Sequence, residues 1–332
     1  MSDEMEDLAT TKATSITSND DGKSTSKRKH EEEKEALTKD GDMPQKKFYR
    51  SRAHCNPLAH NDTFDYPHHP NHMDWTTSDY YPNHPLCTTA TTTGTTTQQP
   101  TMKVAPNVLD IGCGFGGLTV ALSTILPNHT ILGMEIRAKV TEYVRLRIMA
   151  LRKQHSGKYQ NVSVMRSNSM KFMPNFFEKE SIEKLFFCFP DPHFKRKNHP
   201  RRIISTNLLS EYAYFLKPDI GRLYCITDVE ELHQWHISKC RAHPLYRELT
   251  KEECDNDPCV QAMYNETEEG KKVQRAGSNK YYAVYQRLPN TNTTTTDNNN
   301  DNDTSAENFW DSNQFGVSSI VQDDNNTIPF KD

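Results

Sequence analysis

Between residues 107 and 288, short apolar runs alternate with longer amphipathic stretches. The stretches between the apolar runs place apolar residues at helical spacing, as at Val140, Val144 and Ile148. They predict helices near 117–126, 138–155, 203–216 and 230–241. The apolar runs have the length of strands: NVLDI (107–111), TILGMEI (130–136), NVSVMRS (161–167), KLFFCF (184–189), RLYCITDV (222–229) and KYYAVYQRL (280–288). Strands that alternate with helices predict parallel strands joined by right-handed crossovers, and therefore an α/β fold with a doubly wound sheet.

The regions on either side lack this pattern. Residues 1–45 combine Ser, Thr, Asp, Glu and Lys with few large apolar residues, so they are predicted to be disordered. Residues 46–103 are expected to form an extended arm, laid across the body or a partner, that is rich in His, Pro, Tyr and Trp and contains a Thr-rich low-complexity insertion at 88–100. The Asn/Asp-rich residues 289–332 are predicted to be a second disordered tail. Residues 104–288 then form the folded domain.

Charge is distributed unevenly along the chain. Residues 1–45 hold 12 acidic and 7 basic side chains, and residues 289–332 hold 8 acidic and 1 basic side chain. Because the whole chain carries a net charge of −4, subtracting the −5 and −7 of these two tails leaves +8 for residues 46–288. A basic body between acidic tails favours a polyanionic partner.

Other classes of protein and site are disfavoured. The eight cysteines include no C-x-x-C pair, so they are expected to be thiols in a reducing compartment. The sequence has no apolar run of 18 residues and no signal peptide, which argues against secretion and membrane spanning. Histidines cluster at 54–84 without the partner spacing of a metal site, and no metal is expected.

The first predicted strand ends in DIGCGFGG (110–117), a glycine loop that precedes a helix. Its glycines at 112, 114 and 117 match G-x-G-x-x-G, and Glu135 ends the next strand, where a carboxylate accepts hydrogen bonds from ribose hydroxyls. A nicotinamide dinucleotide would use the same parts. The leading Asp110 and the third alternating glycine favour S-adenosylmethionine (SAM), whose amino-acid end carries an ammonium group. Glycines that serve packing alone are the alternative interpretation.

The third and fourth strands end in further polar groups. Asn168 and Ser169 follow the third strand, where they either contact an adenine or act as ordinary turn formers. Asp191 follows the fourth strand between two prolines, which restrict the backbone and present the carboxylate at the strand end. The basic side chains that come next in the chain are expected to neutralise phosphates: Lys195, Arg196, Lys197, Arg201 and Arg202.

With these motifs in place, residues 107–288 resemble the tRNA (guanine-N(7)) methyltransferases, specifically the catalytic subunit of the two-subunit eukaryotic enzyme. The motifs that carry the resemblance are DIGCGFGG, LGMEIR, RSNSMK, FPDPHFKRKNHPRRIIS, LLSEYAYFLKP, ITDVEELHQW and TEEGKKVQRAG, with KFYRSRAHCNP and HMDW upstream. The resemblance implies a class I, Rossmann-like, mostly parallel sheet of seven strands. It also implies methyl transfer from SAM to a variable-loop guanosine of tRNA.

The resemblance further implies roles for particular residues. Asp191 matches the catalytic residue. Lys271 and Lys272 beside the late TEEGKK motif are either phosphate contacts or solvated charges. Cofactor contacts are expected at Gly112, Glu135, Ile136, Arg137, Asn168, Ser169, Cys188, Thr267, Glu268 and Glu269. A noncatalytic WD-repeat β-propeller subunit is the implied partner beside tRNA, and a nuclear location is expected, with weak support from the basic cluster KRKH (27–30).

The chemistry of the expected target limits what the acid must do. N(7) of guanine has a lone pair and no proton, so its attack on a sulfonium methyl needs no general base. Asp191, with Glu269 as a second candidate, is expected to accept hydrogen bonds from the guanine edge and so orient the base. Two alternatives from other classes are a nucleotide-cofactor oxidoreductase and an RNA-binding adaptor that has lost catalysis.

Overall fold

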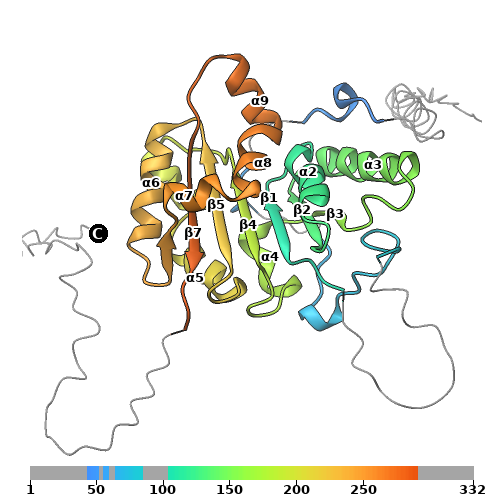
Figure 1. Ribbon diagram of the computed structural model, residues 1–332, viewed down its shortest axis with the longest axis horizontal. Coiled ribbons are helices and arrows are strands. Elements are labelled where there is room, and N and C mark those ends of the chain that lie inside the picture. The colour runs from blue at the N-terminus through green and yellow to red at the C-terminus, as the bar shows by residue number, and fades with distance from the viewer. Residues whose placement is uncertain (1–42, 52–54, 60–63, 85–103, 291–332) are drawn as a thin grey trace, which may run out of the picture.

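A seven-stranded sheet with helices on both faces forms the body of the protein (Figure 1). The computed structural model describes residues 43–51, 55–59, 64–84 and 104–290. The strand order is β3-β2-β1-β4-β5-β7-β6, and β7 is antiparallel to both of its neighbours. The strands are β1 (Val108–Ile111), β2 (Ile131–Glu135), β3 (Val162–Arg166), β4 (Lys184–Cys188), β5 (Arg222–Thr227), β6 (Tyr246–Glu248) and β7 (Tyr281–Arg287).

This topology confirms the predicted doubly wound sheet. The chain runs outward from β1 to β3, returns to β4 on the other side of β1, and continues to β5. Val108 of β1 is in register with both Ile131 of β2 and Lys184 of β4, so these parallel strands end at one edge. All six predicted strands are present. The seventh, β6, has three residues, too few to show an apolar pattern in the sequence.

The four predicted helices are present, and four further α-helices were missed. Missed α4 contains a proline, α7 has five residues, and α8 and α9 follow one another with a single residue between them. The eight helices in the described residues are α2 (Gly117–Ile125), α3 (Ala138–Gln154), α4 (Ser169–Phe176), α5 (Thr206–Phe215), α6 (Glu230–Arg241), α7 (Lys251–Asp255), α8 (Pro258–Glu266) and α9 (Glu268–Arg275).

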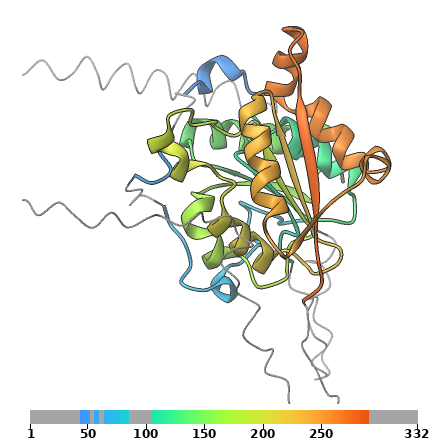
Figure 2. The ribbon, with the colours of Figure 1, turned by 90° about the vertical axis from the view of Figure 1, so that its left-hand side faces the viewer.

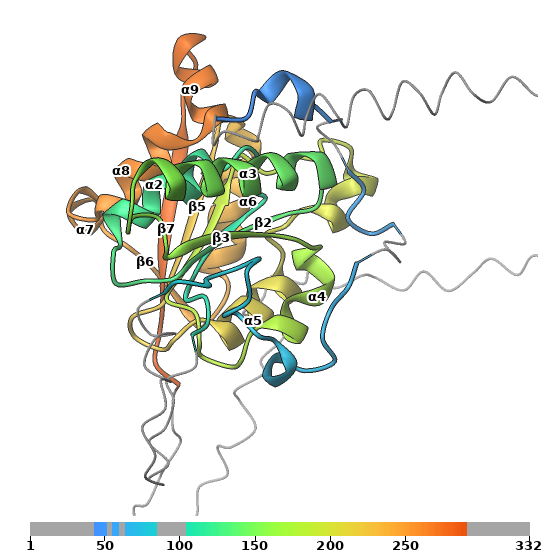
Figure 3. The same cartoon turned by 90° about the vertical axis from the view of Figure 1, so that its right-hand side faces the viewer.

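Two apolar cores lie on the two faces of the sheet. One is built from α4, α5 and α6, and the other from α2, α3 and α8. Figure 3 shows β3 between α3 and α4, which belong to the two different layers. In Figure 2, α9, the short blue helix η1 (Lys46–Tyr49) and the yellow-green segment after β4 lie at the same end of the molecule.

The arm before the domain contributes to both cores. Trp75 and Tyr81 belong to the first core and Tyr49 to the second. The Tyr81 hydroxyl donates a hydrogen bond to the Ile131 carbonyl of β2 at 2.8 Å, in a buried position. The arm also forms two short 3-10 helices, η1 and η2 (Pro70–His72). The described part of the arm is therefore packed on the body.

Several sequence predictions lie outside the described residues. They concern the insertion at 88–100 and nearly all of the tails at 1–45 and 289–332. Within the described ranges the seven cysteines are free thiols. No helix in those ranges is long and apolar enough to cross a bilayer.

Candidate active site

A cavity at the carboxyl ends of β1 to β4 brings most of the predicted site residues together. Residues 112, 135–137, 168–169, 188 and 191 all line it, although 79 residues separate the first from the last. The predicted residues on its wall are Gly112, Glu135, Ile136, Arg137, Asn168, Ser169, Cys188, Asp191 and Arg201. Asp191 and the glycine loop therefore face one space, as the sequence predicted.

The glycines of the loop divide into two pairs. A Cβ atom added at Gly112 or Gly114 would meet no protein atom within 4 Å. A Cβ at Gly116 would lie 2.7 Å from a methyl carbon of Val144, and one at Gly117 would lie 2.3 Å from the Glu266 carbonyl oxygen. The second pair is therefore explained by packing, whereas the first pair leaves room for a ligand beside the backbone.

Glu135 presents a fixed carboxylate at the end of β2. Its Oε2 accepts hydrogen bonds from Arg137 Nη2 at 2.8 Å and from the Gly114 amide at 3.2 Å. Arg137 Nε and its backbone amide donate to Oε1 at 3.0 and 2.9 Å. The hydrogen bonds that the Arg137 guanidinium donates to this carboxylate raise the pKa of the guanidinium. Glu135 thus joins the glycine loop to β2 and places its carboxylate at the cavity wall.

Asp110 does not take the role that the sequence suggested. Its buried carboxylate accepts a hydrogen bond from Thr119 Oγ1 of α2 at 2.6 Å, and it is absent from the residues that line the cavity. Burial, with the nearby Glu268 and Glu135, raises its pKa to about 7, although the Thr119 hydrogen bond lowers it. The carboxylate therefore joins β1 to α2 rather than facing a ligand.

Asn168 caps a helix and also lies on the cavity wall. It is the N-cap of α4, where its side-chain oxygen accepts from the Met170 amide at 3.1 Å, and it also lines the cavity. Its Nδ2 donates to the Pro57 carbonyl at 2.7 Å. Pro57 and Cys55 of the arm also line the cavity. The arm has no periodic pattern from which this contribution could be predicted.

Asp191 lies on a loop after β4 together with a histidine. Its side chain is 30% exposed, and its Oδ2 lies 3.8 Å from His193 Nδ1. The His193 backbone amide also donates to Asp191 Oδ1 at 3.4 Å. His193 lines the cavity and was missed as a site residue, although it stands within the motif FPDPHFK.

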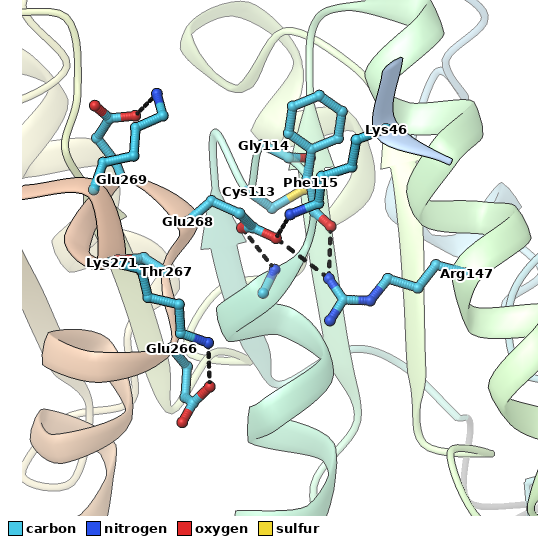
Figure 4. A network of polar contacts seen from close by, with 12 residues as sticks. Lys46, Cys113, Gly114, Phe115, Arg147, Glu266, Thr267, Glu268, Glu269 and Lys271 are labelled. Atoms are coloured by element: carbon cyan, nitrogen blue, oxygen red, sulfur yellow. Dashed lines mark hydrogen bonds and ion pairs between the residues drawn. The ribbon is translucent and has the colours of Figure 1, made fainter. Parts of the chain in front are cut away.

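The late motif caps helices rather than lining the cavity. Thr267 Oγ1 accepts from the Gly270 amide at 3.0 Å and begins α9. Glu268 accepts from the Gly117 amide at 3.1 Å, while its other oxygen pairs with Lys46 Nζ at 3.0 Å and Arg147 Nη1 at 3.4 Å (Figure 4). Exposed Glu269 pairs with Lys272. Thr267, Glu268 and Glu269 are not among the residues that line the cavity.

The basic residues differ in exposure. Lys195, Arg196 and Lys197 are exposed, and Arg201 lines the cavity. Arg202 is buried, so its prediction as a phosphate contact is corrected. Lys271 and Lys272 are exposed and paired with Glu266 and Glu269 at 2.8 and 2.7 Å, as Figure 4 shows for the first pair.

Metal ligation has no candidate group in the part of the chain that the structure describes. No three His, Cys, Asp or Glu side chains there lie close enough together to hold an ion. The cavity wall carries two carboxylates, an asparagine, two serines, a histidine and two arginines, and this mixture of hydrogen-bond donors and acceptors suits an organic ligand with several polar groups.

Comparison with known proteins gives consistent matches over the domain. A family model described as "Putative methyltransferase" matches residues 104–283, which include the cavity except for its arm residues. The tRNA (guanine-N(7)-)-methyltransferase of Schizosaccharomyces pombe is 49% identical over 257 residues, covering 76% of this chain and 88% of the relative. The enzymes of the same name from Eremothecium gossypii and Podospora anserina are 52% and 46% identical, covering 75% and 80% of this chain and 84% and 97% of those relatives.

Proposed function

The chain belongs to the tRNA (guanine-N(7)-)-methyltransferase family, and we propose that it methylates N(7) of a guanosine in tRNA with SAM as the methyl donor. The observation that carries this proposal is the shared cavity. Gly112 and Glu135, which suit the donor, line it together with Asp191, which suits the target base. SAM supplies a methyl group on a sulfonium, which a nitrogen lone pair can attack directly.

The residues of the wall fit such a donor. Glu135 offers carboxylate oxygens for ribose hydroxyls, and Asn168 and Ser169 lie at the end of β3 for an adenine edge. The open side of Gly112 allows a ligand to lie against the loop backbone. Cys188 and Ile136 add apolar wall between these polar groups. These residues bind and orient the donor, and proximity of this kind supplies up to about 7–11 kcal/mol in favourable reactions.

Asp191 orients the acceptor rather than removing a proton. Guanine presents a ring N–H and an exocyclic amine on one edge, and a carboxylate accepts hydrogen bonds from both. The same carboxylate stabilises the positive charge that the ring gains when N(7) is methylated. Adenine offers a ring acceptor where guanine offers the N–H, so it leaves the acid without that partner.

The nucleic acid and the protein partner are expected on the basic side of this cavity and beyond it. Exposed Lys195, Arg196 and Lys197 follow the Asp191 loop and supply charge for a phosphate backbone. From the family resemblance, we infer a noncatalytic WD-repeat β-propeller subunit that holds the tRNA, a variable-loop guanosine as target, and a nuclear location.

A methylation assay tests the proposal. The full chain, purified with its WD-repeat partner, is incubated with labelled SAM and bulk tRNA, and N(7)-methylguanosine is mapped in the product. We expect Asp191→Ala to abolish methyl transfer while the Kd for SAM stays near that of the wild type. Turnover of Asp191→Ala near the wild-type rate would refute the orienting role, and an inactive wild-type complex would refute the proposed function.

A further inference from the structure

One arginine of the basic run after β4 lies inside the protein. Arg202 is 1% exposed and is the largest fully buried side chain among the described residues. Arginine is rarely buried unless its charge is paired and its donors are hydrogen-bonded. A side chain in this position does not reach a phosphate at the surface. Its function must therefore be sought among its neighbours.

Three neighbours hold the guanidinium, and they belong to two separate segments. Its Nε donates to the Pro192 carbonyl at 2.9 Å, and its Nη2 donates to Glu231 Oε1 of α6 at 2.8 Å. Its Cζ lies 4.6 Å from the ring centroid of Trp235, also on α6. The Trp235 indole N–H donates to the Ile204 carbonyl at 2.7 Å, which fixes the ring. Arg202 therefore ties the loop after β4 to a helix of the scaffold.

The loop that Arg202 holds has an unfavourable backbone. Phe189 and His193 have φ angles of +50° and +46°, in the left-handed region that large side chains rarely adopt. Asp191 stands midway between them. Such residues persist where surrounding contacts determine the backbone, and they gather at functional sites. The Phe189 amide is fixed by the Ile226 carbonyl of β5 at 2.8 Å, and Arg202 fixes the other side of the loop.

We propose that Arg202 is a positioning residue for Asp191, which it keeps directed into the cavity by holding the carbonyl of the next residue. This inference rests on the proposed function, because it assigns Arg202 a part in the same reaction. Glu231 and Trp235 hold Arg202 in place: the Glu231 carboxylate balances the buried charge, and the Trp235 ring supports the guanidinium plane. Arg202 contacts neither the donor nor tRNA.

Arg202→Lys is the informative variant. Lysine keeps the charge, but a single ammonium cannot reproduce a planar fork that serves the Pro192 carbonyl, Glu231 and the Trp235 ring together. We expect kcat at saturating SAM and tRNA to fall about 10- to 100-fold, as misplacement of a reacting group does. The KM for tRNA, the Kd for SAM and the salt dependence of tRNA binding should stay unchanged.

Arg201→Lys provides the matched comparison, since it makes the same change one residue earlier on the cavity wall. There we expect a change in the KM for tRNA. Trp235→Leu is a second variant, because the half-buried ring can be removed with less risk to folding. It should lower kcat in the same direction as Arg202→Lys, again without changing the KM for tRNA.

Hydrogen exchange of residues 187–195 gives a readout that needs no catalysis. In the full-length complex, we expect faster exchange in Arg202→Lys than in wild type, with unchanged exchange in the glycine loop 110–117. If the wild-type complex is inactive but exchange of residues 187–195 is faster in Arg202→Lys, the role of Arg202 in positioning the loop is supported and the proposed function is refuted. The proposal is overturned if kcat and loop exchange both match wild type, or if Arg202→Lys changes the KM and the salt dependence as a phosphate contact would.

Discussion

The buried carboxylate of Asp110 makes stability depend on pH. Its pKa rises from 3.8 to about 7 on folding, chiefly because of burial. Between those values the folded chain binds more protons than the unfolded chain, so the free energy of unfolding falls as pH rises. The loss reaches about 4 kcal/mol above pH 7. The Asn side chain in Asp110→Asn can still accept a hydrogen bond from Thr119. We therefore expect this variant to lack the fall in unfolding free energy between pH 5 and pH 8. Urea unfolding of the ligand-free protein at the two pH values measures this difference.

Asp257 is the matched control for that experiment, because it is a buried acid with the opposite shift. Burial raises its pKa, but hydrogen bonds from Tyr224, the Cys259 amide and Arg222 outweigh burial, and the net pKa is lowered. Asp257→Asn should therefore lose stability at pH 8, where the native carboxylate is ionised and paired. If both variants had a lower unfolding free energy than the wild type at pH 8, the explanation given for Asp110 would be contradicted.

How far the sequence predicts a residue's role depends on whether that role is local. Gly112 and Asp191 are recognisable because a loop after a strand presents them, and both lie on the cavity wall. Arg202 cannot be distinguished from Arg201 in the sequence. What separates them is contact with Glu231 and Trp235 of α6, about 30 residues later in the chain. Burial of this kind comes from tertiary packing, which a charge run does not encode.

At the scale of elements, Glu268 links its own helix α9 to three other elements. It caps α2 through the Gly117 amide and pairs with Lys46 of η1 and Arg147 of α3 (Figure 4). Glu268→Gln keeps an acceptor for the cap but loses the charge, so we expect a loss of about 1–2 kcal/mol in unfolding free energy. Chemical denaturation of the wild type and of this variant measures the difference in unfolding free energy.

The neighbouring Glu269 supplies the control for this prediction. It is exposed and pairs with Lys272 on its own helix, so Glu269→Gln should change stability by less than about 0.5 kcal/mol. Equal effects of the two variants on stability would show that the α2 cap is not what Glu268 contributes. The sequence made Glu269 a second candidate for orienting guanine, but Glu269 does not line the cavity, so we expect the same variant to keep methyl transfer near the wild-type rate.

The arm is a structural part of the domain despite its lack of regular pattern. Trp75 is buried and stacks on Phe177 after α4, with 6.0 Å between ring centroids. We expect Trp75→Ala to lower the unfolding free energy by about 3–5 kcal/mol, as for other large core truncations. Thermal and urea unfolding of the purified chain would show it. Met43, which is exposed at the start of the described arm, is the control, and Met43→Ala should have little effect.

The elements themselves were predictable where their pattern is long and periodic. The six strands and the helices α2, α3, α5 and α6 each carry a continuous apolar pattern, and all are present. The strand β6 and the helix α7 have three and five residues, which leave no room for periodicity. The helix α4 contains Pro174, a residue that argues against a helix unless tertiary contacts override it. The sequence predicts an arm laid across the body or a partner, but isolated aromatic residues do not specify which contacts it makes.

At the scale of the whole molecule, the fold brings separate motifs together in one site. Parallel strands in register end at one edge, so loops from four strands form a single cavity. The segment after β4 leads away from that cavity and carries exposed basic side chains. It lies at the end of the molecule where α9 and η1 also lie (Figure 2). Residues 46–288 carry a net charge of +8 between acidic tails, so we expect this body to attract a polyanion such as RNA.

The salt dependence of tRNA binding tests this arrangement. We expect replacement of Lys195, Arg196 and Lys197 together by alanine to weaken tRNA binding and to reduce the slope of log affinity against log salt by about 2–3, because each phosphate contact releases counterions. Fluorescence titration of the complex from 50 to 300 mM salt, about the range in which such contacts are screened, measures the slope. Lys251, 84% exposed and paired with Asp255, is the control: its replacement should leave the slope unchanged. Equal slopes for the triple variant and wild type would place the tRNA backbone elsewhere on the protein.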